Sequence, residues 1–356
     1  MHFGLSEEQS LLRDTVRRYF SDRLDIERIK EMLGGSCPND LWQSVTDMGL
    51  MGVVVPEEYG GSNLSLLDAT IVAEALGEFV VPVPLTGALM AVAAISKHGD
   101  DNQKERYLHG IANGSIRVAY GIKRNHAALH SEGNLVTGRS AVIADVDGAS
   151  HYLLNAGDKL LVVDCSAPGI RVENLKNVDR TRSFAIASFD NTDCDVIAPG
   201  YSEVVNHSIA VGRLSIAAET FGAAEKMFED ARGYSLERYQ FDRPIGSFQS
   251  IKHQLSDMIS DLEPCRSLLW YAAYTYDAEP EEFELHSCLA KSLVSDVAKR
   301  VAKTSLEIHG GMGYTELLGL HLWFKRIETN RQLLGGPEAT RSRAAEIQQF
   351  VIEEVS

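Results

Sequence analysis

Two short segments of this chain combine residue types that suit a phosphate-bearing ligand. The first, residues 238–249, reads Arg-Tyr-Gln-Phe-Asp-Arg-Pro-Ile-Gly-Ser-Phe-Gln. A guanidinium fork matches phosphate oxygens, and an aromatic ring offers a face for stacking. The second, residues 307–315, contains Gly310, Gly311 and Gly313, whose bare backbone permits the close approach of a phosphate. The plainer interpretations are a solvated arginine at a helix end and a glycine turn.

The elements that must position these segments are indicated by the hydrophobic periods. Ser6 followed by Gln9 is a capping box, which predicts a helix at the start of the chain. Helical spacing recurs through residues 66–76 and 85–95, so the first third is expected to be mainly helical.

The middle of the chain has a different texture. From about residue 115 to about residue 205, short apolar runs such as 152–154, 160–163 and 184–187 are separated by Gly, Asp and Asn, which is typical of strands and turns. Beyond residue 206 the helical period returns, most plainly at four-residue steps in Leu285, Leu289, Leu293, Val297 and Val301. We therefore predict an α/β/α chain with a helical domain over 1–115, a β domain over 116–205 and a helical domain over 206–356.

Composition excludes several classes of protein. The net charge of −16 argues against a nucleic-acid surface, which needs clustered Lys and Arg. No stretch reaches the roughly 18 apolar residues of a membrane span, and residues 1–9 lack an export signal. The five cysteines include no CxxC pair, so neither a zinc site nor a disulfide framework is indicated. We expect a cytoplasmic protein without a metal, nucleic-acid or membrane partner.

Three segments together resemble the acyl-CoA dehydrogenase family over almost the whole chain. Residues 42–61, from Trp42-Gln43-Ser44 to Tyr59-Gly60-Gly61, are similar to its N-terminal signature, and residues 238–249 and 307–315 resemble its two FAD-binding stretches. The resemblance implies a middle antiparallel β domain, a C-terminal four-helix bundle, FAD as cofactor, acyl-CoA as substrate and electron-transfer flavoprotein as acceptor. The cofactor-binding residues that it implies are Arg238, Gln240, Phe241, Phe248, Gln249, Glu307, Gly310 and Gly311.

The match is imperfect where the chemistry should occur. Asp242 stands where the family usually has glycine, and Glu307 where it has glutamine. The family loop that holds the flavin ring reads close to Ala-Leu-Thr-Glu-Pro-Gly-x-Gly-Ser-Asp, whereas residues 119–126 here read Ala-Tyr-Gly-Ile-Lys-Arg-Asn-His. The flavin cradle is therefore expected to be eroded.

The catalytic base of the family also has no counterpart. A carboxylate must remove the α-proton of the acyl thioester, and its usual position is Leu334, while an alternative family position falls at Gly212. Glu338 is a weak substitute, and Asp257 is expected on a solvated helix face. Arg213 matches a family arginine near the acyl-CoA pocket, with pairing inside a helix bundle as an equal alternative.

Family tetramers build each FAD site from two subunits, one supplying the flavin cradle and its neighbour supplying the dinucleotide elements. This chain retains the second contribution and lacks the first. The leading hypothesis is a heteromer with a second acyl-CoA dehydrogenase subunit that supplies the base, similar to the bacterial steroid side-chain enzymes. The alternatives are a non-catalytic scaffold subunit and a self-sufficient homo-oligomeric dehydrogenase that uses Glu338.

Overall fold

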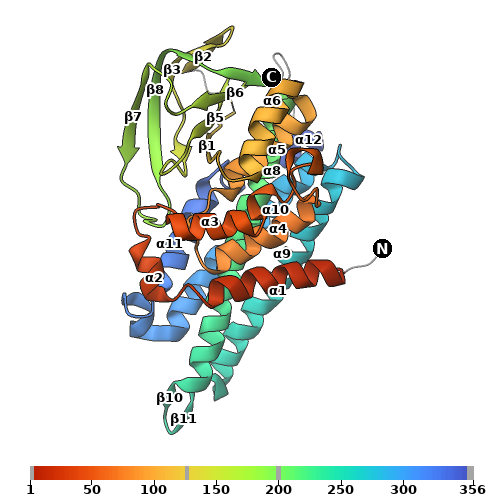
Figure 1. The fold of residues 1–356 in the computed structure, drawn as a ribbon. Helices are drawn as coiled ribbons and strands as arrows, with labels where there is room; N and C mark the ends of the chain where they lie inside the picture. Colours follow the sequence, from red (N-terminus) through yellow and green to blue (C-terminus); the bar gives the residue numbers. More distant parts are fainter. Residues whose placement is uncertain (1–3, 125–127, 198–201, 351–356) are drawn as a thin grey trace, which may run out of the picture. The chain divides into compact units, whose positions relative to one another are not determined.

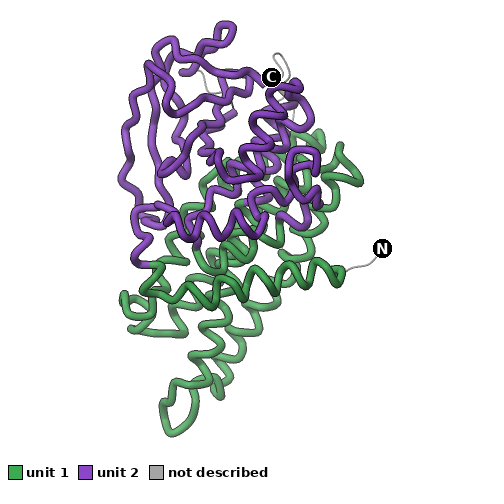
Figure 2. The backbone as a smooth tube through the Cα atoms, viewed as in Figure 1, with its two compact units in different colours: residues 1–29, 70–80, 216–356 green, residues 30–69, 81–215 purple. Residues whose placement is uncertain are grey.

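The computed structural model of the chain describes residues 4–124, 128–197 and 202–350. The chain divides into two compact units, each assembled from segments that are far apart in the sequence (Figure 2). Unit 1 comprises residues 1–29, 70–80 and 216–356, and unit 2 comprises residues 30–69 and 81–215. The order of helices, strands and helices confirms the predicted fold class (Figure 1). The predicted domain boundaries after residues 115 and 205 stay predictions.

Helices precede and follow the strands. Those before are α1 (Glu7–Ser21), α2 (Ile26–Glu31), α3 (Asn39–Asp47), α4 (Leu66–Glu78), α5 (Leu85–His98), α6 (Asp101–Gln103) and α7 (His109–Ala112). Those after are α8 (Ser202–Glu237), α9 (Gln249–Ala278), α10 (Phe283–His309), α11 (Leu320–Gln332) and α12 (Pro337–Ile347). Short turns are η1 (Leu50–Gly52), η2 (Glu57–Tyr59), η3 (Lys104–Leu108), η4 (Ile245–Ser247) and η5 (Gly310–Tyr314). Within the described residues, no helix is both long and apolar enough to cross a membrane.

Helix α1 begins as the sequence predicts. The Ser6 hydroxyl accepts a hydrogen bond from the Gln9 backbone at 3.1 Å, and the Gln9 side chain accepts one from the Ser6 backbone at 3.0 Å. Both exchanges satisfy N–H groups that have no partner inside the helix. The capping box is therefore confirmed.

The middle of the chain forms a nine-stranded sheet in unit 2. Its strands are β1 (Val118–Gly121), β2 (Leu129–Glu132), β3 (Leu135–Arg139), β4 (Ile143–Ala144), β5 (His151–Ala156), β6 (Lys159–Asp164), β7 (Ile170–Leu175), β8 (Phe184–Asp193) and β9 (Asp195–Ile197). They follow the order β2-β3-β8-β4-β1-β5-β6-β9, and β7 also pairs with β8. The pairs are antiparallel except β1 with β5, where Val118 lies opposite His151 in a parallel register. The predicted antiparallel β domain is thus confirmed, with this one parallel pair as its exception among the described strands.

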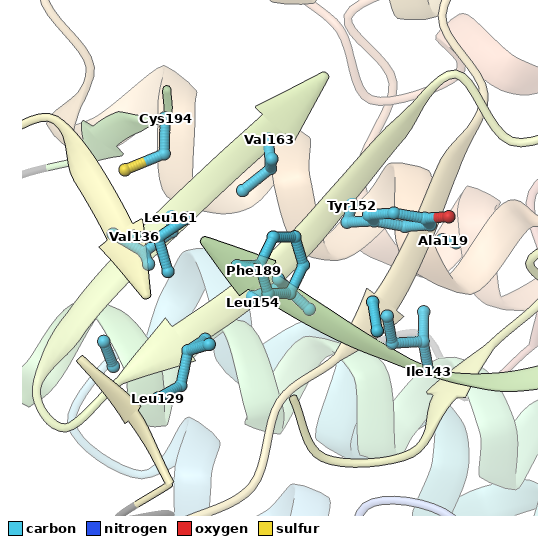
Figure 3. Close-up of a cluster of buried hydrophobic side chains, with 12 residues drawn as sticks. Ala119, Leu129, Val136, Ile143, Tyr152, Leu154, Leu161, Val163, Phe189 and Cys194 are labelled. Carbon is cyan, nitrogen blue, oxygen red and sulfur yellow. The ribbon is translucent and has the colours of Figure 1, made fainter. Parts of the chain in front are cut away.

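Alternate side chains of these strands build the core of unit 2 (Figure 3). Leu154 on β5 and Leu161 on β6 are fully buried, and Phe189 on β8 is 4% exposed. All six residues of β5 are buried, so this strand carries apolar side chains on both faces. The continuous apolar run at 152–154 therefore marks a central strand.

The N-terminal signature serves backbone geometry in unit 2. Trp42 is buried, and its indole N–H donates to the Gly114 carbonyl at 3.1 Å. The Arg117 guanidinium lies 4.2 Å from the Trp42 ring centroid. A Cβ on Gly61 would collide with the carbonyl of Val55, so only glycine fits there.

Glycine also sets the closest helix crossing in unit 1. A Cβ on Gly77 of α4 would collide with the backbone of Glu219 on α8, and a Cβ on Gly222 would collide with the backbone of Glu74. Glu219, at this crossing, also forms a buried ion pair with Arg326. Arg326 has no exposed surface and also donates to the Val80 carbonyl at 3.3 Å.

Candidate cofactor and catalytic site

The two segments predicted to bind phosphate lie at the ends of paired helices in unit 1. Arg238 directly follows α8, and Gly310 directly follows α10. The rings of Tyr234 on α8 and His309 on α10 stack with centroids 4.6 Å apart. One turn earlier on α10, the Ser305 hydroxyl donates to the Met227 carbonyl of α8 at 2.7 Å. The fold therefore brings together two segments that are about seventy residues apart in the printed sequence.

The first segment forms a tight hairpin between α8 and α9. Strands β10 (Tyr239–Gln240) and β11 (Arg243–Pro244) pair across a two-residue turn of Phe241 and Asp242. Both turn residues have positive φ, 53° for Phe241 and 63° for Asp242. This is the conformation that favours Gly or Asn, so phenylalanine is strained there. Phe241 is also 86% exposed, and such strain on an exposed aromatic residue points to a ligand or partner.

An arginine and an aromatic ring stack beside this turn. The Arg243 guanidinium lies 4.0 Å from the Phe248 ring centroid, and the Phe241 ring meets Phe248 edge to face at 6.1 Å. Arg238, Gln240 and Gln249 are exposed. The predicted residues of this segment thus present a guanidinium, two amides and two rings on one short loop.

The second segment offers an open stretch of backbone. Gly310 has φ 60° and ψ −141°, a conformation that is essentially restricted to glycine. No heavy atom counted as a packing neighbour lies within 4 Å of a Cβ placed on Gly310 or Gly311. Glu307 is exposed, with one carboxylate oxygen 3.8 Å from the Lys303 ammonium. Packing therefore does not require Gly311, whose backbone lies open, and the residues present fit the diphosphate end of FAD.

The segment expected to cradle the flavin ring is hydrogen-bonded inside unit 2 at Lys123. The Tyr120 side chain is 2% exposed. The Lys123 N–H donates to the Asn155 side chain at 2.9 Å, and the Asn155 amide donates back to the Lys123 carbonyl at 3.1 Å. Asn125 and His126 lie outside the described residues. The backbone of Lys123 is thus occupied by Asn155, and the described residues 119–124 do not fit a flavin ring.

The usual base position lies in the turn between α11 and α12. Leu334 is half-buried and has φ 55°, followed by Gly335 at φ 102°. Glu338, in the first turn of α12, keeps 71% of its side chain exposed and lies 3.2 Å from Arg331 and 3.8 Å from Arg341. A hydrogen bond from its own backbone N–H, and then the Arg331 guanidinium, hold the pKa of Glu338 below its ordinary value. A general base works best with a pKa near the working pH, so this environment does not favour Glu338 as the base.

A buried lysine that sequence reasoning missed holds this turn. Lys291 on α10 has no exposed surface, and its ammonium donates to the carbonyls of Asn330 at 2.8 Å and Arg331 at 3.1 Å and to Ser295 at 3.1 Å. A cation at the carboxyl end of α11 is favoured by the helix dipole. Beside it, Asp296 accepts from Arg331 at 3.2 Å and from Arg341 at 2.8 Å. The sequence offered little signal for it, because Lys291 lies one helical turn from Ser287 and Ser295 and its carbonyl partners are on another helix.

The remaining candidates lie on long helices. Arg213 on α8 is 5% exposed, and Gly212 beside it is buried. Asp257 on α9 is exposed, which confirms the expectation of a solvated face.

Known proteins resemble this chain along its whole length. The family model described as acyl-CoA dehydrogenase, N-terminal domain, matches residues 6–115, and the C-terminal domain model of the same family matches residues 202–348. The acyl-CoA dehydrogenase IpdE2 of Mycolicibacterium smegmatis is 28% identical over 351 residues, covering 96% of this chain and 100% of that protein.

Solved structures share the fold. One described as the Tcur3481-Tcur3483 steroid ACAD G363A variant superposes with a TM-score of 0.89 at 27% identity, covering 97% of this chain and 98% of that one. Butyryl-CoA dehydrogenase from Megasphaera elsdenii superposes with a TM-score of 0.89 at 22% identity, covering 98% and 100%.

Proposed function

Because the chain belongs to the acyl-CoA dehydrogenase family, we propose that it is the non-base subunit of a heteromeric, FAD-dependent acyl-CoA dehydrogenase. In this role it completes the FAD site of a catalytically intact partner, which supplies the flavin cradle and the base. Electron-transfer flavoprotein is the proposed electron acceptor. The 27% identical structure described as a steroid ACAD supports a bulky, steroid-derived acyl group as the substrate.

One contrast within the chain carries this proposal. The dinucleotide segments, residues 238–249 and 307–315, belong to unit 1 and lie exposed at the ends of α8 and α10. In them, Gly310 has a conformation that only glycine adopts readily, and Phe241 is strained and exposed. The segment expected to hold the flavin in unit 2 instead closes its Lys123 backbone on Asn155. Position 334 carries a leucine, which has no proton-accepting group.

Each group of this chain has a definite task in the proposed complex. Arg238 neutralises the pyrophosphate of FAD, Phe248 and Phe241 offer faces to the adenosine, and Gly310 and Gly311 admit the diphosphate to the backbone. When bound, FAD accepts the hydride that leaves the β-carbon of the thioester. Arg213 is proposed to lie by the acyl-CoA pocket.

The test is the flavin content of the purified protein, read from its visible absorbance. The chain alone should carry substoichiometric flavin and oxidise no acyl-CoA, because residues 119–124 do not hold a flavin ring. Co-expression with the proposed partner subunit should give a yellow, active complex. Full flavin occupancy of the isolated chain would favour the self-sufficient enzyme, and a colourless complex would favour the scaffold.

A further inference from the structure

A cavity of about 690 Å³ lies in unit 2, on the β7 side of the sheet. Its lining comes from the α2–α3 loop, the β4–β5 loop, β7 and the β7–β8 loop. A volume in this range matches sites for small organic ligands. None of the dinucleotide segments contributes to it, since Arg238 and Gly310 belong to unit 1.

The walls of the cavity are tied together by backbone contacts. The Gly34 N–H donates to the Arg180 carbonyl at 2.7 Å, which joins the α2–α3 loop to the β7–β8 loop. A Cβ on Gly35 would collide with the backbone of Arg182 and Ser183, so these two loops touch directly. The Asp147 N–H donates to the Ser183 hydroxyl at 2.9 Å, which adds the β4–β5 loop. The cavity is therefore preformed and needs little ordering to accept a ligand.

The β7–β8 loop at the rim carries two arginines, of which Arg182 is buried and Arg180 is exposed. The carboxylate of Asp179, 1% exposed, accepts from the Thr181 N–H at 2.9 Å and from the Thr181 hydroxyl. Arg182 is directed inward and donates to both oxygens of Asp145, at 2.9 and 2.7 Å. Arg180, between them in sequence, remains exposed.

Two cationic side chains at this rim are exposed and form no ion pair within the described residues. Lys176 and Arg180 both line the cavity and are exposed, and within the described part of the chain neither has a carboxylate partner. The Asp147 and Asp179 carboxylates also line the cavity, and that of Asp179 is held by Thr181, so the attraction for an anion is confined to the surroundings of Lys176 and Arg180. The same cavity is lined by Phe184, Asn174 and Asn177. The Asn177 amide N–H donates to the Asp179 carbonyl at 2.6 Å, which leaves its amide oxygen for a ligand.

We propose that this cavity binds a nucleotide-sized organic phosphate, with Lys176 and Arg180 at the phosphates. The apolar wall that includes Phe184 accommodates the ring system, and the Asn174 and Asn177 amides supply hydrogen bonds to its polar edge. Attraction between exposed cations and a phosphate is screened by salt, so affinity should fall as sodium chloride rises. This site goes beyond the proposed FAD role and does not depend on it.

The experiment is calorimetric titration of ADP into the full chain carrying Arg238→Ala, which weakens competing binding at residues 238–249 and 307–315. Adding Lys176→Ala with Arg180→Ala should raise the dissociation constant about tenfold or more, the usual effect of losing charge-assisted hydrogen bonds. The matched control, Lys97→Ala with Arg171→Ala, removes two exposed charges of unit 2 that do not line the cavity, although Arg171 lies on β7, and should leave the affinity unchanged.

Three results would overturn the proposal. They are no ADP binding in the Arg238→Ala chain at millimolar ligand, equal affinity in the two double variants, and adenosine binding as tightly as ADP. Titration with inorganic pyrophosphate tests whether the cavity instead binds a free phosphate that carries no nucleoside. Weaker binding of pyrophosphate than of ADP supports a nucleotide, and equal binding would overturn the nucleotide assignment.

Discussion

At the scale of single residues, Arg238 is the most direct test of the dinucleotide segments. Its guanidinium is exposed at the end of α8, and its backbone is fixed by hydrogen bonds with Tyr234 and Ile245, at 2.9 and 2.8 Å. Arg238→Ala should weaken FAD binding by the assembled complex by about 1.5–3 kcal/mol, the range for a hydrogen bond to a charged group. Arg232→Ala, on the same helix and paired with Glu229 at 2.6 Å, is the control. Equal flavin affinity in both variants would make Arg238 structural.

Glu74 gives a second prediction, about stability and pH. Burial raises its pKa to about 7, although the Arg266 and Arg17 charges oppose the shift. Its carboxylate accepts from the Trp270 indole at 3.1 Å. A folded-state pKa above the unfolded value means that the folded state binds more protons between about pH 4.5 and 7, so stability falls as pH rises through that window.

Glu74→Gln keeps an acceptor for Trp270 and removes the titration. We expect the variant to match the natural protein near pH 4.5 and to be more stable above pH 7, by at most about 3 kcal/mol. Urea denaturation across this range measures the difference, with Glu263→Gln, an exposed glutamate on α9, as control. A natural protein whose stability is flat from pH 5 to 7 would contradict the pKa assignment.

At the scale of elements, the β10–β11 hairpin holds a residue that its turn does not favour. A positive φ costs an ordinary residue about 1–2 kcal/mol, and asparagine tolerates it better. Because Phe241 is 86% exposed, Phe241→Asn loses little packing. We expect it to raise the free energy of unfolding by about 0.5–1 kcal/mol and to weaken FAD binding by the complex. Leu236→Asn, which alters an exposed apolar residue just before the hairpin, should not increase stability. Unchanged FAD affinity in Phe241→Asn would mean that the ring serves no ligand.

Elements also show where sequence reasoning succeeded. The capping box of α1 and the strand runs in β5, β6 and β8 are local signals, and local hydrogen bonding or side-chain alternation determines each of them. The four-residue apolar pattern on α10 correctly predicted a helix, and its members Leu285, Val297 and Val301 are buried. Leu293 is the exception, with 38% of its surface exposed while Val294 beside it is buried.

Sequence reasoning was weaker where distant segments meet. The parallel pairing of β1 with β5 depends on the path of the chain, and no turn signal encodes it. Lys291 could not be assigned from its own segment, since its partners at 330 and 331 lie on another helix. The stack of Tyr234 on His309 is likewise visible only in the folded unit. The family resemblance predicted that the two dinucleotide segments act together, and the structure shows the contacts between α8 and α10 beside them.

At the scale of the whole molecule, the proposed division of labour concerns two chains. Unit 1 presents the dinucleotide segments, and the α11–α12 turn keeps a defined shape through Lys291 although position 334 carries no acid. An ordered α11–α12 turn without a carboxylate at position 334 is consistent with a subunit whose fold serves assembly. In the proposed complex the base comes from the partner.

The last prediction tests that origin directly. Glu338→Gln should leave turnover of the complex nearly unchanged, because Glu338 is exposed, paired with Arg331 and Arg341, and has a lowered pKa. Glu346→Gln, at another exposed and ion-paired glutamate of α12, is the matched control. Converting the partner's catalytic glutamate to glutamine should instead reduce turnover by roughly 10²–10⁴-fold with FAD still bound, since that is the usual contribution of a general base. A collapse of turnover from Glu338→Gln, with flavin retained and the control active, would show that this chain carries its own base, and the heteromer would lose its chemical reason.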